Sequence, residues 1–317
     1  MIKSLSLLSF FGLLLIGCSG TKNQVVEEEP PKPTDKQLTT LLGEPLPEKT
    51  FSDSTIRLDF ENKLADAKAN FEQYPDSVDC IIWYGRRLAY LGRHEEAIDV
   101  YSAGLKKFPE AYRLLRHRGH RYLTTRQIDK AIRDFGEAVA KSVNEPNAIE
   151  PDGLPNSQNI PLGNDKFNIW YHFGLAHYLN GRYDRAYSAY RQCMTFSDND
   201  DLKAATSYWL YMAAVRSGSN TVAERTLREI STSWEMIENE AYMDLLLLFK
   251  GILSVDAILE KATGPDGTLN PTYGYGIGFH YLRKDQPEAA NEIFQRALAG
   301  PSWESFGYIA SEAEVSR

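Results

Sequence analysis

Cysteine, an excess of basic charge and long apolar runs are all scarce in this sequence of 317 residues. Its 3 cysteines are too few for a disulfide-stapled scaffold. Acidic residues outnumber basic ones by 43 to 35, and the net charge of −8 argues against a nucleic-acid-binding protein, which needs a surplus of Lys and Arg to meet phosphates. A hydrophobic content of 43% is nevertheless enough for a folded core, so the chain as a whole is not disordered.

The most apolar run of the chain lies at its N-terminus. Residues 5–16 follow Lys3 and are too short to cross a hydrocarbon core of about 30 Å at about 1.5 Å per residue. We therefore predict a signal peptide over residues 1–17. The ending LIGC at residues 15–18 resembles the bacterial lipobox, which implies that Cys18 becomes an acylated N-terminus, with chains such as palmitate, that holds the protein on a membrane. The alternative is an ordinary signal peptide that ends in Gly-Cys.

A polar segment follows the cysteine. Residues 27–33 read EEEPPKP, and Pro45 and Pro47 come later in the same segment. Such a stretch cannot bury enough apolar surface to order itself, so we expect residues 18–54 to form the lipidated N-terminus and a disordered tether. Ser19 rather than Asp follows the cysteine, which resembles the sorting signal for the outer membrane of Gram-negative bacteria. We therefore expect an outer-membrane anchor, with the protein on the periplasmic or the surface-facing side.

The remaining chain repeats itself with a period of about 34 residues. Gly85, Ala97 and Tyr101 in the first repeat return as Gly, Ala and Phe one period later. Small residues at these positions let the two helices of a unit approach closely, and the aromatic residue fills the space beside them. This is the tetratricopeptide (TPR) pattern, and the resemblance implies an all-α superhelical solenoid of antiparallel helix pairs over residues 55–317. The expected units are 78–111, 112–145, 167–200, 204–237 and 271–304, with a lone helix at 55–73, a degenerate pair at 238–263 and a C-terminal cap at 303–315.

One segment interrupts the repeats. Residues 144–166 contain Pro146, Pro151, Pro155 and Pro161 together with glycine and asparagine, which is typical of a loop. Inserted loops of this length are usually either functional or disordered. The sequence leaves open whether this segment covers the groove of the solenoid or extends freely from it.

The order of the parts resembles a narrower family. A lipobox, a tether, regular repeats, the stretch SYWLYMA at residues 207–213, a degenerate pair and a closing repeat also occur in the NlpI-type TPR lipoproteins. That resemblance implies an outer-membrane adaptor that presents cell-wall hydrolases to proteases and synthases and forms homodimers. The insert at 144–166 departs from the family's pattern, so no binding residue is carried over from it.

Candidate binding residues come from the TPR resemblance, in which positions 2, 5, 9, 12 and 13 of the first helix of each unit line the concave groove. The basic members are candidates for binding an acidic or carboxylate-bearing peptide, because guanidinium groups bind carboxylates bidentately. Alternatively, these basic residues form a solvent-exposed face and pair with Glu95, Glu96 or Asp99. The aromatic members are candidate anchors for an extended peptide or for sugar rings. The chosen residues are Arg86, Arg113, Arg116, His120, Tyr171, Tyr178, Tyr275 and Arg283.

Signals for catalysis are weak. His117 and His120 lie one turn apart, but no nearby Cys, Asp or Glu completes a metal site in that helix. Cys80 and Cys193 fall in different units, and we expect two buried free thiols. The sequence has neither a phosphate-binding Gly-Lys-Ser/Thr loop nor a Gly-x-Ser-x-Gly elbow. We expect no enzyme, no metal and no cofactor. The apolar run at residues 245–249 is expected to pack the degenerate pair, with a dimer interface as the alternative.

These features favour a lipid-anchored envelope adaptor that binds extended segments of envelope proteins, such as cell-wall hydrolases or their proteases, in its TPR groove. Two alternatives belong to other classes. In the first, Tyr171, Tyr178 and Tyr275 stack on sugars and the protein binds glycans or peptidoglycan. In the second, the protein is a structural subunit of an outer-membrane assembly complex.

Overall fold

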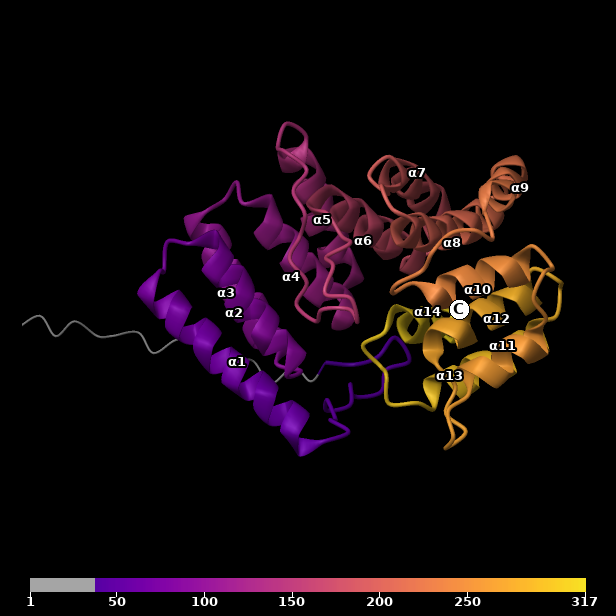
Figure 1. Ribbon diagram of the computed structural model, residues 1–317, viewed down its shortest axis with the longest axis horizontal. Helices are drawn as coiled ribbons and strands as arrows, with labels where there is room; N and C mark the ends of the chain where they lie inside the picture. The colour runs from indigo at the N-terminus through magenta and orange to yellow at the C-terminus, as the bar shows by residue number, and fades with distance from the viewer. Residues whose placement is uncertain (1–37) are drawn as a thin grey trace, which may run out of the picture. The chain divides into compact units, whose positions relative to one another are not determined.

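The computed structural model describes residues 38–317, so Cys18, the signal peptide and the first part of the expected tether lie outside the described residues. Within the described part the chain is helical, and its extended pairing is limited to isolated β-bridges. The helices follow one another as antiparallel neighbours (Figure 1). They are α1 (Ser54–Gln73), α2 (Val78–Tyr90), α3 (His94–Lys107), α4 (Tyr112–Thr124), α5 (Ile128–Ser142), α6 (Asp165–Leu179), α7 (Tyr183–Met194), α8 (Asp200–Arg216), α9 (Asn220–Glu229), α10 (Glu240–Phe249), α11 (Val255–Ala262), α12 (Pro271–Leu282), α13 (Pro287–Leu298) and α14 (Phe306–Val315).

Each predicted repeat corresponds to one helix pair. The unit at 78–111 is α2 with α3, and the unit at 271–304 is α12 with α13. Local chemistry sets the ends of these helices. The Ser77 side chain accepts a hydrogen bond from the backbone N–H of Cys80 at the start of α2, and glycine in the left-handed region, such as Gly92 with φ of 80°, makes the turn into the next helix. The expected helical solenoid is confirmed for the described residues.

A small residue facing an aromatic ring holds the two helices of a unit together. A Cβ atom added at Gly85 of α2 would lie 2.4 Å from the ring of Tyr101 on α3, and one added at Gly278 of α12 would lie 2.2 Å from the ring of Phe294 on α13. Only glycine allows this approach. In the α8–α9 unit the sizes are exchanged, since Tyr211 stands at the glycine position and Leu227 at the aromatic one.

The C-terminal helix α14 folds back onto the inner side of the earlier repeats. It contacts α6, α12 and α13. At its start, Phe306 packs against His120 of α4 and His172 of α6. Near its end, Glu312 accepts two hydrogen bonds from Arg126, of 2.7 and 2.9 Å, in a buried ion pair. The cap thus fills space that a solenoid groove would leave open.

The segment before α1 also differs from expectation. The tether was expected to reach residue 54, but the backbone N–H of Leu41 donates to Glu312 on α14, and Lys49 pairs with Glu304 just before that helix. Residues 38–53 are therefore fixed against the C-terminal cap by polar contacts. The expected disordered tether therefore does not include residues 38–53.

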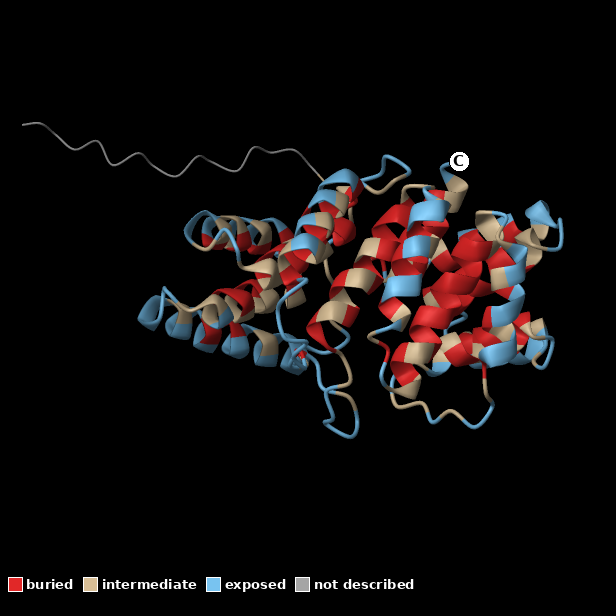
Figure 2. Ribbon diagram, turned by 90° about the horizontal axis from the view of Figure 1, so that it is seen from above, coloured by how far each residue is buried: buried red, intermediate tan, exposed pale blue. Residues whose placement is uncertain are grey.

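The apolar run of the degenerate pair belongs to the core. Leu245, Leu248 and Phe249 of α10 are at most 4% exposed, so this run packs the interior instead of forming a dimer interface. Figure 2 shows buried residues concentrated in the later helices, while α1 is largely exposed. No helix in residues 38–317 is long and apolar enough to cross a membrane.

Candidate functional site

The predicted binding residues separate into two groups. Arg86 lies on α2 and Arg113 and Arg116 lie on α4, where they come together beside the insert. The aromatic candidates and Arg283 lie in the interior of the later repeats. The expected gradient along one continuous groove, basic at one end and aromatic at the other, is therefore not present.

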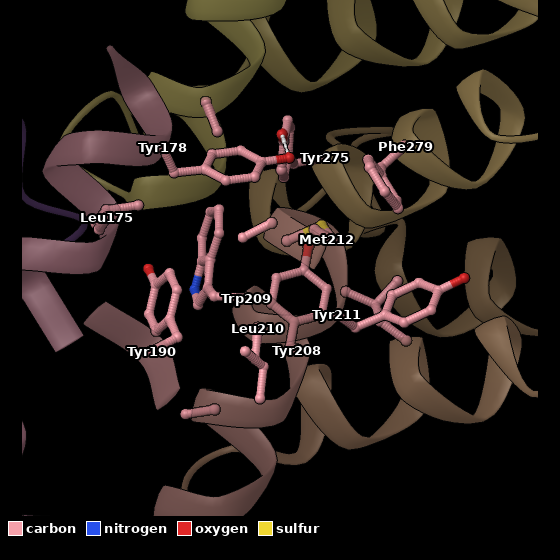
Figure 3. Close-up of a cluster of buried hydrophobic side chains, with 14 of the residues drawn as sticks. Leu175, Tyr178, Tyr190, Tyr208, Trp209, Leu210, Tyr211, Met212, Tyr275 and Phe279 are labelled. Carbon is pink, nitrogen blue, oxygen red and sulfur yellow. Dashed lines mark hydrogen bonds between the residues drawn. The ribbon is translucent and has the colours of Figure 1, made fainter. Parts of the chain in front are cut away.

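The three tyrosines are core residues. Tyr171, Tyr178 and Tyr275 are 6%, 1% and 1% exposed. The Tyr275 hydroxyl donates to the Tyr178 oxygen at 2.6 Å, and the two rings pack with Trp209 in one aromatic cluster (Figure 3). The Trp209 indole N–H donates to the Tyr171 oxygen at 2.8 Å. Their ring faces are covered by other helices, so they cannot stack on a peptide or a sugar. The glycan-binding alternative depended on these three tyrosines and is therefore left without binding residues.

Arg283 and His120 are also held by internal contacts. Arg283 donates to the Tyr211 hydroxyl at 2.6 Å and to the Phe249 carbonyl at 3.2 Å. His120 packs against His172, with ring centroids 4.5 Å apart. Both side chains contact helices of other repeats, and neither is among the residues that line the cleft between α2, α4 and the insert.

The basic group borders a cleft of about 440 Å³ between α2, α4 and the insert. Asp79, Ile82 and Arg86 supply its α2 wall, and Arg113 supplies part of its α4 wall. These are groove positions expected from the repeat pattern. The indole of Trp83 adds an aromatic surface, and the guanidinium of Arg86 lies 4.6 Å from its ring centroid. We take this α2–α4 cleft as the candidate functional site.

Arg113 is the accessible cation of the cleft. It donates to Asp79 at 2.7 Å and its Nε lies 3.8 Å from Asp165. Burial is the largest single influence and lowers the pKa of Arg113, but the hydrogen bond to Asp79 and the negative charges of Asp79 and Asp165 together raise it above its ordinary value. Its side chain remains 30% exposed, so it can meet a ligand from solvent.

Arg116 lies deeper and already binds a carboxylate. It is 8% exposed, and its Nη2 lies 3.1 Å from Glu150 of the insert. Its Nη1 donates to His117 Nδ1, which must accept and therefore carries no proton. Burial, together with the neighbouring Arg116, holds the pKa of His117 well below its ordinary value, in agreement with a neutral ring.

The insert therefore covers part of the expected groove. Arg86 donates to the Pro151 carbonyl at 2.8 Å, and Arg87 donates to the Gly153 carbonyl at 3.2 Å. Of the two roles left open for this segment, the structure shows the covering one. The arginines of α4 do not form the alternative pairs with Glu95, Glu96 or Asp99. Arg118 pairs with Asp134 instead, and Glu96 pairs with Arg93.

Trp83 and Glu150 in this region were not recognised from the sequence, and the contact that Arg126 makes with the C-terminal cap was not predicted. Trp83 precedes Arg86 and Arg87 by one helical turn, and that spacing was the signal for a stacked cation. Glu150 lies in a loop without periodicity, so the repeat pattern gave no signal for it. Arg126 stands one period after Gly92, in a turn position where other units have glycine, and an arginine there is the sign of a special contact.

Other chemistry is limited in the described part of the chain. No group of three or more His, Cys, Asp or Glu side chains in residues 38–317 is arranged to hold a metal ion. Cys193 is a buried free thiol, as expected, and burial raises its pKa to about 12. Cys80 is free but only half-buried, which corrects the expectation of two buried thiols.

Comparison with known proteins supports the repeat assignment. Residues 85–148 and 167–200 match family models described as tetratricopeptide repeat, so the chain contains TPR repeats. Similar solved structures include YrrB, a TPR protein described as having an unusual peptide-binding site, at 14% identity and a TM-score of 0.42, covering 74% of this chain and 91% of that one. A TPR protein from Parabacteroides merdae is 14% identical with a TM-score of 0.48, covering 82% of this chain and 94% of that one. No curated protein matches the chain.

Proposed function

We propose that this protein is a non-catalytic, lipid-anchored adaptor of the bacterial outer membrane that binds an extended acidic segment of another envelope protein in the α2–α4 cleft. One observation carries the binding proposal. An accessible guanidinium, Arg113, stands in a cleft lined by groove positions of two consecutive TPR repeats. A cation in a partly desolvated cleft favours a carboxylate partner, because hydrogen bonds between charged groups are the strong ones.

The anchor and the partner class rest on the sequence. The lipobox-like residues 15–18 support acylation at Cys18, and Ser19 supports the outer membrane. The layout shared with NlpI-type lipoproteins supports cell-wall hydrolases or their proteases as partners, and a homodimer. The proposal predicts that wild-type protein incorporates a labelled fatty acid and that Cys18→Ala does not. Membrane fractionation of Cys18→Ala without any labelling of the wild type would contradict the anchor.

A capture experiment tests the cleft. Arg113→Gln removes the charge without placing a carboxylate beside Asp79 and Asp165, and Arg133→Gln removes an exposed arginine from α5 as the matched control. We expect Arg113→Gln to lower the recovery of crosslinked envelope partners about tenfold, the effect of one charge-assisted hydrogen bond of about 1.5 kcal/mol. The control should match wild type.

The same experiment separates the adaptor from a structural subunit of an assembly complex. A structural subunit would be recovered in one stable stoichiometric complex, and its recovery would be equal from wild type, Arg113→Gln and Arg133→Gln. That result would remove the cleft from the proposal.

A further inference from the structure

The insert is bound to the cleft wall almost entirely through polar groups. Glu150 is 6% exposed, and its Oε2 accepts a hydrogen bond of 3.1 Å from Asn168 on α6 while Oε1 faces Arg116. Arg86 Nη1 and His117 Nε2 each lie 3.9 Å from the same Oε1. One carboxylate therefore lies near two arginines and a neutral histidine from two helices.

The backbone after Glu150 is held by two arginines of α2. The carbonyl of the next residue, Pro151, accepts from Arg86, and the carbonyl of Gly153 accepts from Arg87. A Cβ atom at Gly153 would lie 1.6 Å from the Tyr90 hydroxyl and 2.6 Å from Arg86 Nη2, so a side chain there would displace the ends of these two side chains. Glu-Pro-x-Gly is thus the pattern that this surface fits.

Three aliphatic side chains of the insert are exposed, and one of them, Ile149, lines the cleft together with Ile82 and Trp83. Ile149, Leu154 and Ile160 are 66%, 58% and 46% exposed. One carboxylate oxygen of Asp152 is buried without a hydrogen-bond partner in the described part of the chain, so the fit of the insert is imperfect. A segment held chiefly by ionic and backbone contacts can be exchanged for another of the same chemistry.

We infer that the insert is an internal occupant of the partner site, and that the partner segment is an extended peptide with a glutamate followed by proline and glycine in the pattern Glu-Pro-x-Gly. The partner's glutamate takes the place of Glu150 between Arg86, Arg116 and Asn168. This inference rests on the proposed function and places the partner's glutamate beside the α2–α4 cleft, which Arg86 also lines. It also means that the wild-type chain competes with its partner, because the tethered segment is present at high effective concentration.

The probe for this inference is a fluorescein-labelled peptide with the sequence of residues 146–158, PNAIEPDGLPNSQ, and its matched control carries Gln in place of the glutamate. Two full-length variants release the insert by different routes. Glu150→Gln removes the buried charge, and Gly153→Val forces the backbone away from Tyr90 and Arg86. Ser157→Ala changes an exposed residue of the same insert and serves as the control protein.

Fluorescence anisotropy should show that both release variants bind the glutamate peptide about tenfold or more tightly than wild type or Ser157→Ala, because the competing segment is gone. The Gln peptide should bind none of the proteins. Absence of saturable binding to the release variants, or equal binding of the two peptides, overturns the inference.

Wild-type protein provides a second measurement that needs no substitution. The backbone N–H of Glu150 donates to the Gly163 carbonyl at 3.0 Å and that of Asp165 donates to the Ala148 carbonyl at 2.9 Å, so hydrogen exchange at these amides reports whether the paired ends of the insert open. Exchange at both amides should rise when excess glutamate peptide is added. Unchanged exchange overturns the inference. The adaptor proposal is tested separately, by the capture experiment with Arg113→Gln.

Discussion

At the scale of single residues, the most informative departure from the repeat is Arg126. It adopts φ of 59°, in the left-handed region that glycine adopts at Gly92 and Gly181 in the same turn of other units. An arginine there costs about 1 kcal/mol or more in backbone strain. Its guanidinium compensates by binding Glu312 and the Trp303 carbonyl, which fixes the C-terminal cap to the turn after α4.

The Arg126–Glu312 pair predicts a non-additive pattern of stability. Glu312→Gln leaves the Arg126 charge buried, so it should lower the free energy of unfolding by about 3–5 kcal/mol. The double variant Arg126→Gly with Glu312→Gln restores a glycine turn and removes both charges, so it should be more stable than Glu312→Gln alone. Urea unfolding measures both values. A double variant that loses the sum of the two single losses would contradict the explanation.

Buried histidine predicts the response to acid. Burial lowers the pKa of His172 to about 3, whereas an unfolded histidine has a pKa of about 6.5. Between these values the unfolded chain binds more protons than the folded one, so stability falls as the pH decreases from about 6.5. His172 alone should cost about 2 kcal/mol between pH 7 and pH 5.

The measurement is chemical unfolding at both pH values for wild type and His172→Phe, which keeps an aromatic ring but cannot be protonated. The variant should lose about 2 kcal/mol less than wild type over this interval. Equal losses in the two proteins would show that His172 does not set the acid response.

At the scale of elements, the repeat pattern predicted the helix pairs because each depends on residues of one unit. The Gly85–Tyr101 and Gly278–Phe294 contacts lie within single pairs, so their spacing in the sequence was sufficient to place them. Contacts between distant elements could not be predicted in this way. The covering of Tyr178 by α12 and the seating of Glu150 against α4 depend on how the repeats curve and on a loop without periodicity.

Two glycines on different helices provide a matched test of this pairing. A Cβ atom at Gly278 would lie 2.2 Å from Phe294, whereas one at Gly136 would lie 3.8 Å from Phe173, an ordinary contact. Gly278→Ala should therefore destabilise the protein by about 1–3 kcal/mol through overpacking. Gly136→Ala should be neutral or stabilising by up to about 1 kcal/mol, since alanine favours the helix. Thermal unfolding distinguishes them, and similar melting temperatures for the two variants would contradict the packing account.

At the scale of the whole described chain, α14 and the insert occupy the inner face that the repeats form. Phe306 and Glu312 close the face beside α4 and α6, and Glu150 closes the neighbouring stretch beside α2. The aromatic residues that were expected in the groove, Tyr171, Tyr178 and Tyr275, are core residues because other helices pack onto them. The part left open is the cleft with Trp83 and Arg113, which explains why one end of the predicted groove is retained as a candidate site and the other is not.

In-cell photo-crosslinking from the cleft tests the central claim most directly. Benzoylphenylalanine at Trp83, which lines the cleft, is compared with the same group at Tyr187 on α7, an aromatic position outside it. The account predicts discrete adducts with envelope proteins from position 83, lost when Arg113→Gln is combined with it, and no such adducts from position 187. The same adducts from both positions, or adducts from position 83 that persist with Arg113→Gln, would contradict it.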